Sequence, residues 1–175
     1  MQEEMILRAV GVVRSPIKEA IPVPEGENGI SESYRERLRA YFKEVKETVS
    51  WVEIFPELEG ILEGIEEFSH IFVIYWPHLL PRGQLTEFRV HPRGRKDVPK
   101  KGIFATLSPR RPNPILLSPV KLIEVRENRL RVQGLDAVDG SVVLDIKPYV
   151  PYYHMIAESV APLWIEKKGG GRDMI

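Results

Sequence analysis

The chain contains no cysteine, and this absence excludes several kinds of chemistry. Among its 175 residues there is no thiol, so a disulfide framework, a thiolate nucleophile and a thiolate metal site are all excluded. The four histidines, His70, His78, His91 and His154, do not pair at metal-ligand spacing. We therefore expect a protein without a bound metal.

Long apolar runs and glycine-rich phosphate loops are also lacking. No run approaches the roughly 18–20 apolar residues of a membrane-spanning helix. The N-terminal "MQEEMILRAV" lacks the charged-then-apolar pattern of a signal peptide. We expect a cytoplasmic protein that makes no membrane contact. No G-x-G-x-x-G follows an expected strand and no Walker-type loop occurs, so a dinucleotide-binding α/β fold has no support.

Apolar residues make up 43% of the chain, which suits one globular domain. We expect that domain over residues 1–165, followed by a flexible tail at 166–175.

The formal net charge is zero, but the charges are unevenly distributed. Residues 1–70 hold 8 Lys/Arg against 15 Asp/Glu, whereas residues 82–111 hold 9 Lys/Arg against 2 Asp/Glu. The basic stretch is either a footprint for a polyanion or a solvated loop that balances the acidic first half.

Short apolar and alternating segments dominate the sequence. Strands are expected at 5–13, 49–55, 70–76, 84–90 and 102–107, then in a hairpin around Glu127-Asn128 and after a turn at Asp139-Gly140. One amphipathic helix is expected at about 33–49, with Ser33 and Glu36 as a capping box. We predict a mainly β fold, a small antiparallel β-barrel of seven or eight strands with this one helix.

Residues 108–119 read "SPRRPNPILLSP", with four prolines and two adjacent arginines. Proline removes a backbone donor and fixes φ, which disfavours an ordinary helix or strand. One interpretation is a polyproline ligand for an aromatic groove on a partner. The apolar segments on both sides favour another, a rigid wall of the domain's own site.

Two polar residues stand at places where sites form. His78 follows Trp76-Pro77 at the end of an expected buried strand. Asp136 precedes the Asp139-Gly140 turn, where a carboxylate can accept hydrogen bonds from a ligand. Paired carboxylates also suggest a glycosidase, which spacing alone does not establish.

Five segments in order resemble a known family: "GVVRSP" (11–16), "GIEEFSHIFVIYW" (64–76), "HPRG" (91–94), "GIFATLSPRRPNPILLSPVKLIEV" (102–125) and "LDAVDGSVVLDIKPYVP" (135–151). Over residues 6–153 the chain resembles the TsaA/TrmO-like family of β-barrel tRNA methyltransferases. The strings "SPRRPNP" and "DIKPY" are the most specific part of the match.

The resemblance implies S-adenosylmethionine bound on a small β-barrel, usually in a homodimer, and methylation of N6 of threonylcarbamoyl-adenosine beside the anticodon of a tRNA. It implies cofactor contacts at Pro24, Glu25, Gly26, His78, Leu79, Leu107, Leu117, Leu135, Asp136, Ala137, Val138, Asp139 and Gly140. Asp136 and His78 are the candidate catalytic bases. Candidate RNA contacts are Arg93, Arg95, Lys96, Lys100, Lys101, Arg110 and Arg111.

The chain departs from the family pattern at two leucines. Leu107 stands where family members commonly carry an arginine, and Leu116 stands where they commonly carry a glycine. Losing an arginine removes a bidentate partner for a carboxylate. This departure motivates an alternative function, a module or sensor that binds S-adenosylmethionine without transferring its methyl group.

Overall fold

The computed structural model describes residues 5–20, 31–80 and 87–165. The strands are β1 (Gly11–Arg14), β2 (Val49–Ile54), β3 (His70–Trp76), β4 (Arg89–Val90), β5 (Lys101–Gly102), β6 (Leu116–Arg126), β7 (Arg129–Gln133) and β8 (Val142–Pro148). The α-helices are α1 (Glu32–Glu47) and α2 (Pro151–His154), and short 3₁₀ helices lie at Pro56–Leu58, Ile65–Glu67, Pro92–Gly94 and Ile103–Ala105. Within these ranges no helix is long and apolar enough to cross a membrane.

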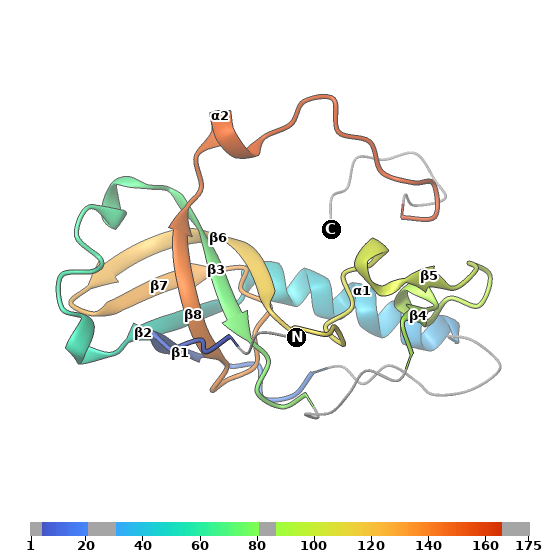
Figure 1. Cartoon of the computed structure of the whole chain (residues 1–175), viewed down its shortest axis with the longest axis horizontal. Coiled ribbons are helices and arrows are strands. Elements are labelled where there is room, and N and C mark those ends of the chain that lie inside the picture. Colours follow the sequence, from blue (N-terminus) through green and yellow to red (C-terminus); the bar gives the residue numbers. More distant parts are fainter. Residues whose placement is uncertain (1–4, 21–30, 81–86, 166–175) are drawn as a thin grey trace.

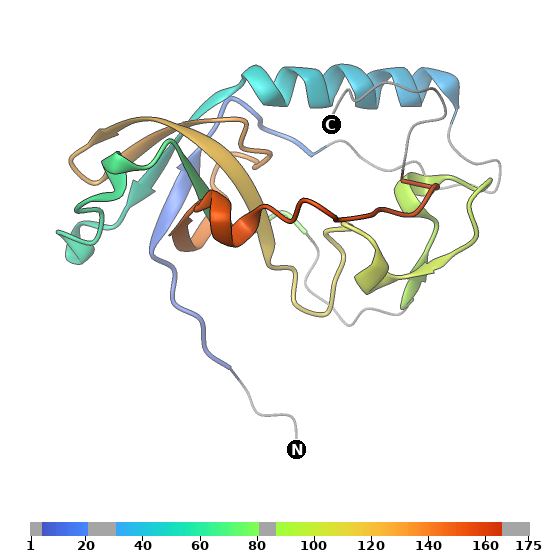
Figure 2. The ribbon, with the colours of Figure 1, turned by 90° about the horizontal axis from the view of Figure 1, so that it is seen from above.

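Six strands close into an antiparallel barrel in the order β1-β2-β7-β6-β3-β8. The predicted β-barrel is confirmed, but the barrel has six strands, because β4 and β5 pair only with each other in a separate two-stranded sheet. Figures 1 and 2 show the barrel at one side of the molecule and β4–β5 at the other, with α1 extending from the barrel toward β4–β5. The domain limits of 1–165 stay a prediction, and the tail at 166–175 lies outside the described residues.

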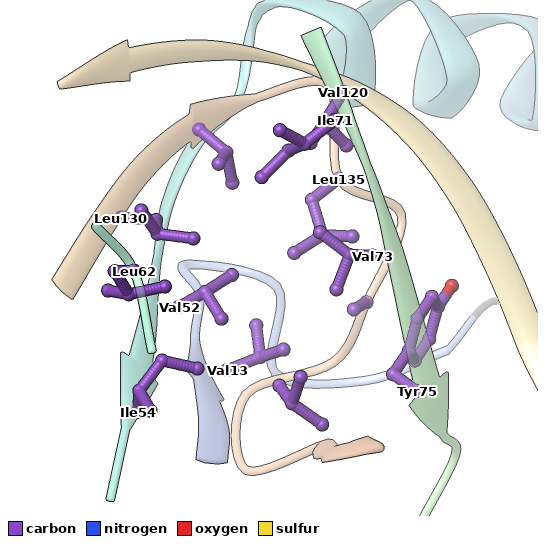
Figure 3. Close-up of a cluster of buried hydrophobic side chains, with 13 residues drawn as sticks. Val13, Val52, Ile54, Leu62, Ile71, Val73, Tyr75, Val120, Leu130 and Leu135 are labelled. Carbon is purple, nitrogen blue, oxygen red and sulfur yellow. The ribbon is translucent and has the colours of Figure 1, made fainter. Parts of the chain in front are cut away.

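Alternating side chains fill the barrel. In β2, Ser50, Val52 and Ile54 are buried while the residues between them are partly exposed, as the two-residue period of a strand requires. In the apolar run of β3, only Ile71, Val73 and Tyr75 reach full burial. The inward-facing side chains come from every barrel strand and from the loop before β8 (Figure 3). Barrel closure thus buries one face of each strand.

The N-cap of helix α1 lies two residues earlier than the capping-box prediction. Ser31, not Ser33, has the extended backbone of an N-cap, and its side chain accepts a hydrogen bond from the backbone N–H of Tyr34. The helix ends at Glu47, and Thr48 leads directly into β2. The predicted helix is therefore confirmed, while its predicted cap is wrong.

One strand prediction around the basic stretch is wrong, and another is confirmed only in part. Residues 102–107 are not a strand: only Lys101–Gly102 pair with β4, and the backbone then turns into the 3₁₀ helix Ile103–Ala105. The expected strand at 84–90 contributes only Arg89–Val90 among the described residues. Thr106 reinforces the turn, because its hydroxyl donates to the carbonyl of Ile103 at 2.8 Å.

The last part of "SPRRPNPILLSP" joins β6, which carries Pro119 opposite Phe72 of β3. The N–H of Leu122 donates to Ser69 O on the β3 side, so the alternation of the strand turns the Pro119 nitrogen toward the other edge. Pairing with β7 on that edge begins only at Lys121. A proline is tolerated here because no ladder bond is lost.

Gly11 is required by a close approach between β1 and β2. A Cβ at this position would lie 2.3 Å from the carbonyl oxygen of Glu53, a backbone atom that cannot move aside alone. We expect Gly11→Ala to lower the free energy of unfolding by about 1–3 kcal/mol, measured by chemical denaturation. The control is Gly102→Ala, where a Cβ would meet nothing within 4 Å. Equal denaturation midpoints for the two variants would contradict this account.

Candidate functional site

One end of the barrel gathers most of the predicted cofactor contacts. Tyr75 of β3 pairs with Leu116 of β6 and with Val143 of β8, so the end of β3 and the starts of β6 and β8 lie together. Pro77-His78 leaves β3 here, and residues 135–140 enter β8 here. The segments that motif reasoning singled out therefore meet in space.

Asp139 holds the turn to the exit of β1. Its Oδ1 accepts the backbone N–H of Ser15 at 3.0 Å, and its Oδ2 accepts Lys18 Nζ at 2.9 Å. Its own N–H donates to Ile17 O at 2.7 Å. The bond from Lys18, then that from Ser15, lowers the pKa of the Asp139 carboxyl below its usual value near 3.8. Both carboxylate oxygens of Asp139 are therefore engaged in hydrogen bonds within the protein.

Asp136 is placed differently, with its side chain exposed and aimed at α1. Its Oδ1 accepts a 2.6 Å hydrogen bond from the Tyr41 hydroxyl, while Oδ2 has no partner among the described residues. Its backbone carbonyl accepts the Tyr75 hydroxyl at 2.5 Å. Asp136 is therefore fixed at its backbone and at one oxygen, leaving the other for a ligand.

The two tyrosines act as neutral donors at neutral pH. Burial raises the pKa of Tyr75 to about 12, and burial together with the bond to Asp136 raises the pKa of Tyr41 above its usual value. Tyr75 lies inside the barrel and Tyr41 lies on α1, so Asp136 accepts hydrogen bonds from two separate elements. Sequence reasoning missed both tyrosines, because Tyr41 belongs to an amphipathic stripe that core packing fully explained.

His78 lies against the aspartate turn. A Cβ on Gly140 would sit 3.3 Å from His78 Nε2, and Gly140 has a φ of +82°, a conformation that favours glycine. The imidazole itself is exposed. The structure thus brings His78 together with the turn, as expected if both serve one site.

The other predicted cofactor contacts divide by exposure. Leu135 and Ala137 are buried in the barrel core and can offer a ligand only backbone atoms, whereas Val138 is partly exposed. Leu79 and Leu117 are each 59% exposed, and Leu107 is 94% exposed. Pro24, Glu25 and Gly26 lie outside the described residues.

A hollow lies beside the turn, between the exit of β1 and α1. Its volume is about 240 Å³. Its lining comprises Pro16, Ile17, Lys18, Glu19, Tyr41, Glu44, Val45 and Thr48. Because Tyr41 bonds Asp136 and Lys18 bonds Asp139, the hollow adjoins the aspartate turn. Its lining carries side chains of both charge signs.

The adjacent arginines of the proline loop have different environments. Arg111 Nη1 donates to the carbonyls of Thr106 at 2.8 Å and Ser108 at 3.4 Å, and its guanidinium lies 5.6 Å from the centroid of the Phe104 ring. Arg110 is exposed. Arg111 therefore ties the loop together, and Arg110 is directed to solvent.

The remaining basic residues lie on or near β4–β5. Arg95 is engaged by Asp97 at 2.6 Å and by the Trp164 carbonyl at 3.0 Å. Lys100 pairs with Glu87 at 3.5 Å. Lys96 is exposed and Lys101 is partly exposed, while the side chain of Arg93 lies outside the described part of the chain. The structure thus leaves these cations at the far side of the molecule from the barrel (Figure 1).

The fold and this site define a small antiparallel barrel with a polar, ligand-accessible end. The family model described as "tRNA-methyltransferase O N-terminal domain" matches residues 39–155. The chain belongs to this family.

A relative from Methanothermobacter thermautotrophicus, named "Probable S-adenosyl-L-methionine-binding protein", is 46% identical over 146 residues, covering 83% of this chain and 90% of the relative. A mouse (Mus musculus) protein, "tRNA (adenine(37)-N6)-methyltransferase", is 42% identical over 101 residues, covering 57% of this chain and 23% of the relative. The crystal structure of TrmO from Pseudomonas aeruginosa matches with a TM-score of 0.64 and 29% identity, covering 91% of this chain. This chain spans 62% of the length of that one.

The Asp139 bonds predict an acid-dependent loss of stability. Because the folded-state pKa is below that of the unfolded chain, the charged carboxylate stabilises the fold above the unfolded pKa near 3.8, and this contribution is lost as pH falls through the folded-state value. Asp139→Asn should be less stable than wild type at pH 7, with a gap that narrows toward pH 3. Urea unfolding across this range measures the gap. Asp145→Asn, at an exposed carboxylate on β8, controls for loss of one charge; a gap at Asp139 that is constant with pH would refute the role.

Proposed function

We propose that this chain is an S-adenosylmethionine-dependent tRNA methyltransferase that acts on N6 of threonylcarbamoyl-adenosine beside the anticodon. The observation that carries the proposal is Asp136, whose carboxylate is held at one oxygen by Tyr41, has no partner at the other among the described residues, and lies three residues before the turn that His78 contacts at Gly140. The names of the mouse and Methanothermobacter relatives support the reaction and the cofactor.

The residues at the barrel end fit the cofactor's chemistry. S-adenosylmethionine carries a carboxylate, an ammonium, a sulfonium and a flat adenine. Lys18 in the hollow offers a cation, while Glu19 and Glu44 offer anions. The exposed Leu79 and Leu117 offer apolar surface for the adenine. When bound, the cofactor supplies an electrophilic methyl group for in-line displacement.

The chain's own residues then position and deprotonate the nucleophile. The Oδ2 atom of Asp136, which has no partner in the described part of the chain, accepts the proton that the N6 nitrogen must lose, and the Tyr41 bond keeps the carboxylate oriented toward it. His78 lies against Gly140 and is the second candidate for this proton. The target base lies in an unpaired loop of the tRNA, so it needs little unpairing to reach the barrel end.

A homodimer in the cytoplasm is part of the proposal. The segment after β8 carries large apolar side chains with high exposure: Tyr152, Tyr153, Met155, Ile156, Val160 and Leu163. In Figures 1 and 2 this segment runs away from the barrel toward β4–β5. Exposed apolar surface of this extent favours a protein partner, and a second copy of the chain fits the family expectation.

A second candidate function is binding of S-adenosylmethionine without methyl transfer. Leu107, at the position of the usual family arginine, is 94% exposed and cannot pair with a carboxylate. The name of the Methanothermobacter relative refers to binding alone.

Substitution of Asp136 separates these functions. We expect Asp136→Asn to lower the rate of tRNA methylation by about 100- to 10,000-fold, the usual contribution of a general base, with Tyr41→Phe losing about tenfold through one charge-assisted hydrogen bond. Mass spectrometry of tRNA nucleosides measures the product, and calorimetry measures S-adenosylmethionine binding. Asp145→Asn is the control. Tight binding by wild type without any methylated nucleoside would favour the second function.

Charge reversal tests the RNA-binding surface. Lys96, Lys101 and Arg110 make no ion pair among the described residues, so replacing all three by glutamate should spare the fold. We expect a loss of at least tenfold in tRNA affinity at low salt and a shallower salt dependence, since each lost phosphate contact lowers the logarithmic slope by about 0.7–0.9. Filter binding at several salt concentrations measures both quantities.

The matched control reverses three cations elsewhere, with the same change in net charge. Arg37, Lys43 and Lys121 are exposed on α1 and β6 and make no ion pair among the described residues. This control should keep most of the tRNA affinity. Equal losses in the two triple variants would show that net charge, not the basic stretch, governs binding.

A further inference from the structure

Two phenylalanines are conspicuously exposed in the element that contains β4 and β5. Phe88 is 66% exposed and Phe104 is 77% exposed, although burying such rings would stabilise the fold. The N–H of Ile103 donates to Phe88 O at 2.9 Å, so the backbone that carries Phe104 lies next to the backbone that carries Phe88. Ile103 beside them is buried. The element therefore has a small core and two rings left outside it.

Each ring has at least one cationic side chain beside it. A hollow of about 320 Å³ is lined by Glu87, Phe88, Arg89 and Lys100. Arg89 Nη2 donates to the Lys100 carbonyl at 3.2 Å, which fixes the guanidinium beside the hollow. Glu87 pairs with Lys100 at 3.5 Å, and both side chains are substantially exposed, so this pair is weak and can exchange for a phosphate.

Phe104 is held against a cation of its own. The Arg111 guanidinium lies 5.6 Å from its ring centroid, and the same guanidinium is anchored to the Thr106 carbonyl. Most of the ring still faces solvent. The side chain is therefore oriented in advance of any ligand, which lowers the entropy lost on binding.

Exposed rings among cations match one class of ligand best. Unpaired nucleobases stack on aromatic rings while Lys and Arg hold the phosphates between them. A duplex hides its base faces and offers no such contact. The loop 106–115 connects this element directly to β6 at the barrel end, so bases on these rings would belong to the same RNA loop as the modified nucleotide.

We propose that Phe88 and Phe104 form a stacking platform for unpaired nucleobases that flank the modified nucleotide, with Arg89 and Lys100 contacting their phosphates. The platform rests on the tRNA substrate of the proposed function. It makes the β4–β5 element a reader of single-stranded RNA rather than a general basic surface.

The test compares a loop with a duplex. Phe88→Leu and Phe104→Leu keep an apolar side chain but remove the ring. We expect each to weaken binding of an anticodon stem-loop RNA by about fivefold to a hundredfold, with little change for a fully paired RNA of the same composition. Fluorescence anisotropy measures both, and 2-aminopurine placed in the loop reports stacking directly. Phe104→Trp, which keeps an aromatic ring, should bind the loop about as tightly as wild type does.

The outcomes also separate the platform from the catalytic proposal. Leucine variants that bind the loop as wild type does, or that lose loop and duplex binding equally, overturn the platform while tRNA methylation by wild type leaves the enzyme proposal standing. Selective loss of loop binding in a protein that never methylates tRNA supports the platform and overturns the enzyme. Failure of wild type to bind the stem-loop overturns the platform outright.

Discussion

The closure of the barrel between β1 and β8 is the constraint on which the site depends. The two strands share only the pairs Gly11↔Val143 and Val12↔Val142, so the seam is short. Asp139 extends it, because its carboxylate binds the backbone beyond β1 while Gly140 N–H donates to Val13 O at 2.8 Å. The seam fixes the turn, the turn fixes Asp136, and α1 then reaches Asp136 through Tyr41. The Asp139 carboxylate, which supports barrel closure, thus helps to position the Asp136 carboxylate that we propose as the catalytic base.

Much of the fold could be predicted where structure is local. The hairpin at Glu127-Asn128 and the turn at Asp139-Gly140 follow from nearby residues alone, and both are confirmed. Residues 102–107 have the composition of a strand, yet within the described part of the chain no strand pairs with them beyond Gly102, and the backbone turns into a 3₁₀ helix instead. The number of strands in the barrel depends on pairing between segments that are far apart in the sequence. A short stretch of sequence does not reveal such pairing. Composition shows that a segment suits a sheet, and tertiary structure decides whether a sheet is there.

The candidate site shows the same division. The motif "LDAVDG" predicted both Asp136 and Asp139 as cofactor contacts and only Asp136 as a candidate base. The structure adds that both oxygens of Asp139 are engaged, whereas one oxygen of Asp136 has no partner among the described residues. Tyr41 could not be found from sequence, because a tyrosine in an amphipathic stripe packs or bonds according to what the helix meets. The contact spans 95 positions.

The proline loop illustrates why charge belongs in a rigid segment. Pro109, Pro112 and Pro114 have no N–H, so the carbonyls around them find few backbone donors. Arg111 supplies donors to two of these carbonyls and stacks near Phe104 in the same geometry. Arg110 has no such task and faces solvent. Arg111 therefore supplies hydrogen-bond donors that the prolines cannot. Arg110 is left exposed on a backbone that the prolines and Arg111 hold in place, where it can contact a ligand.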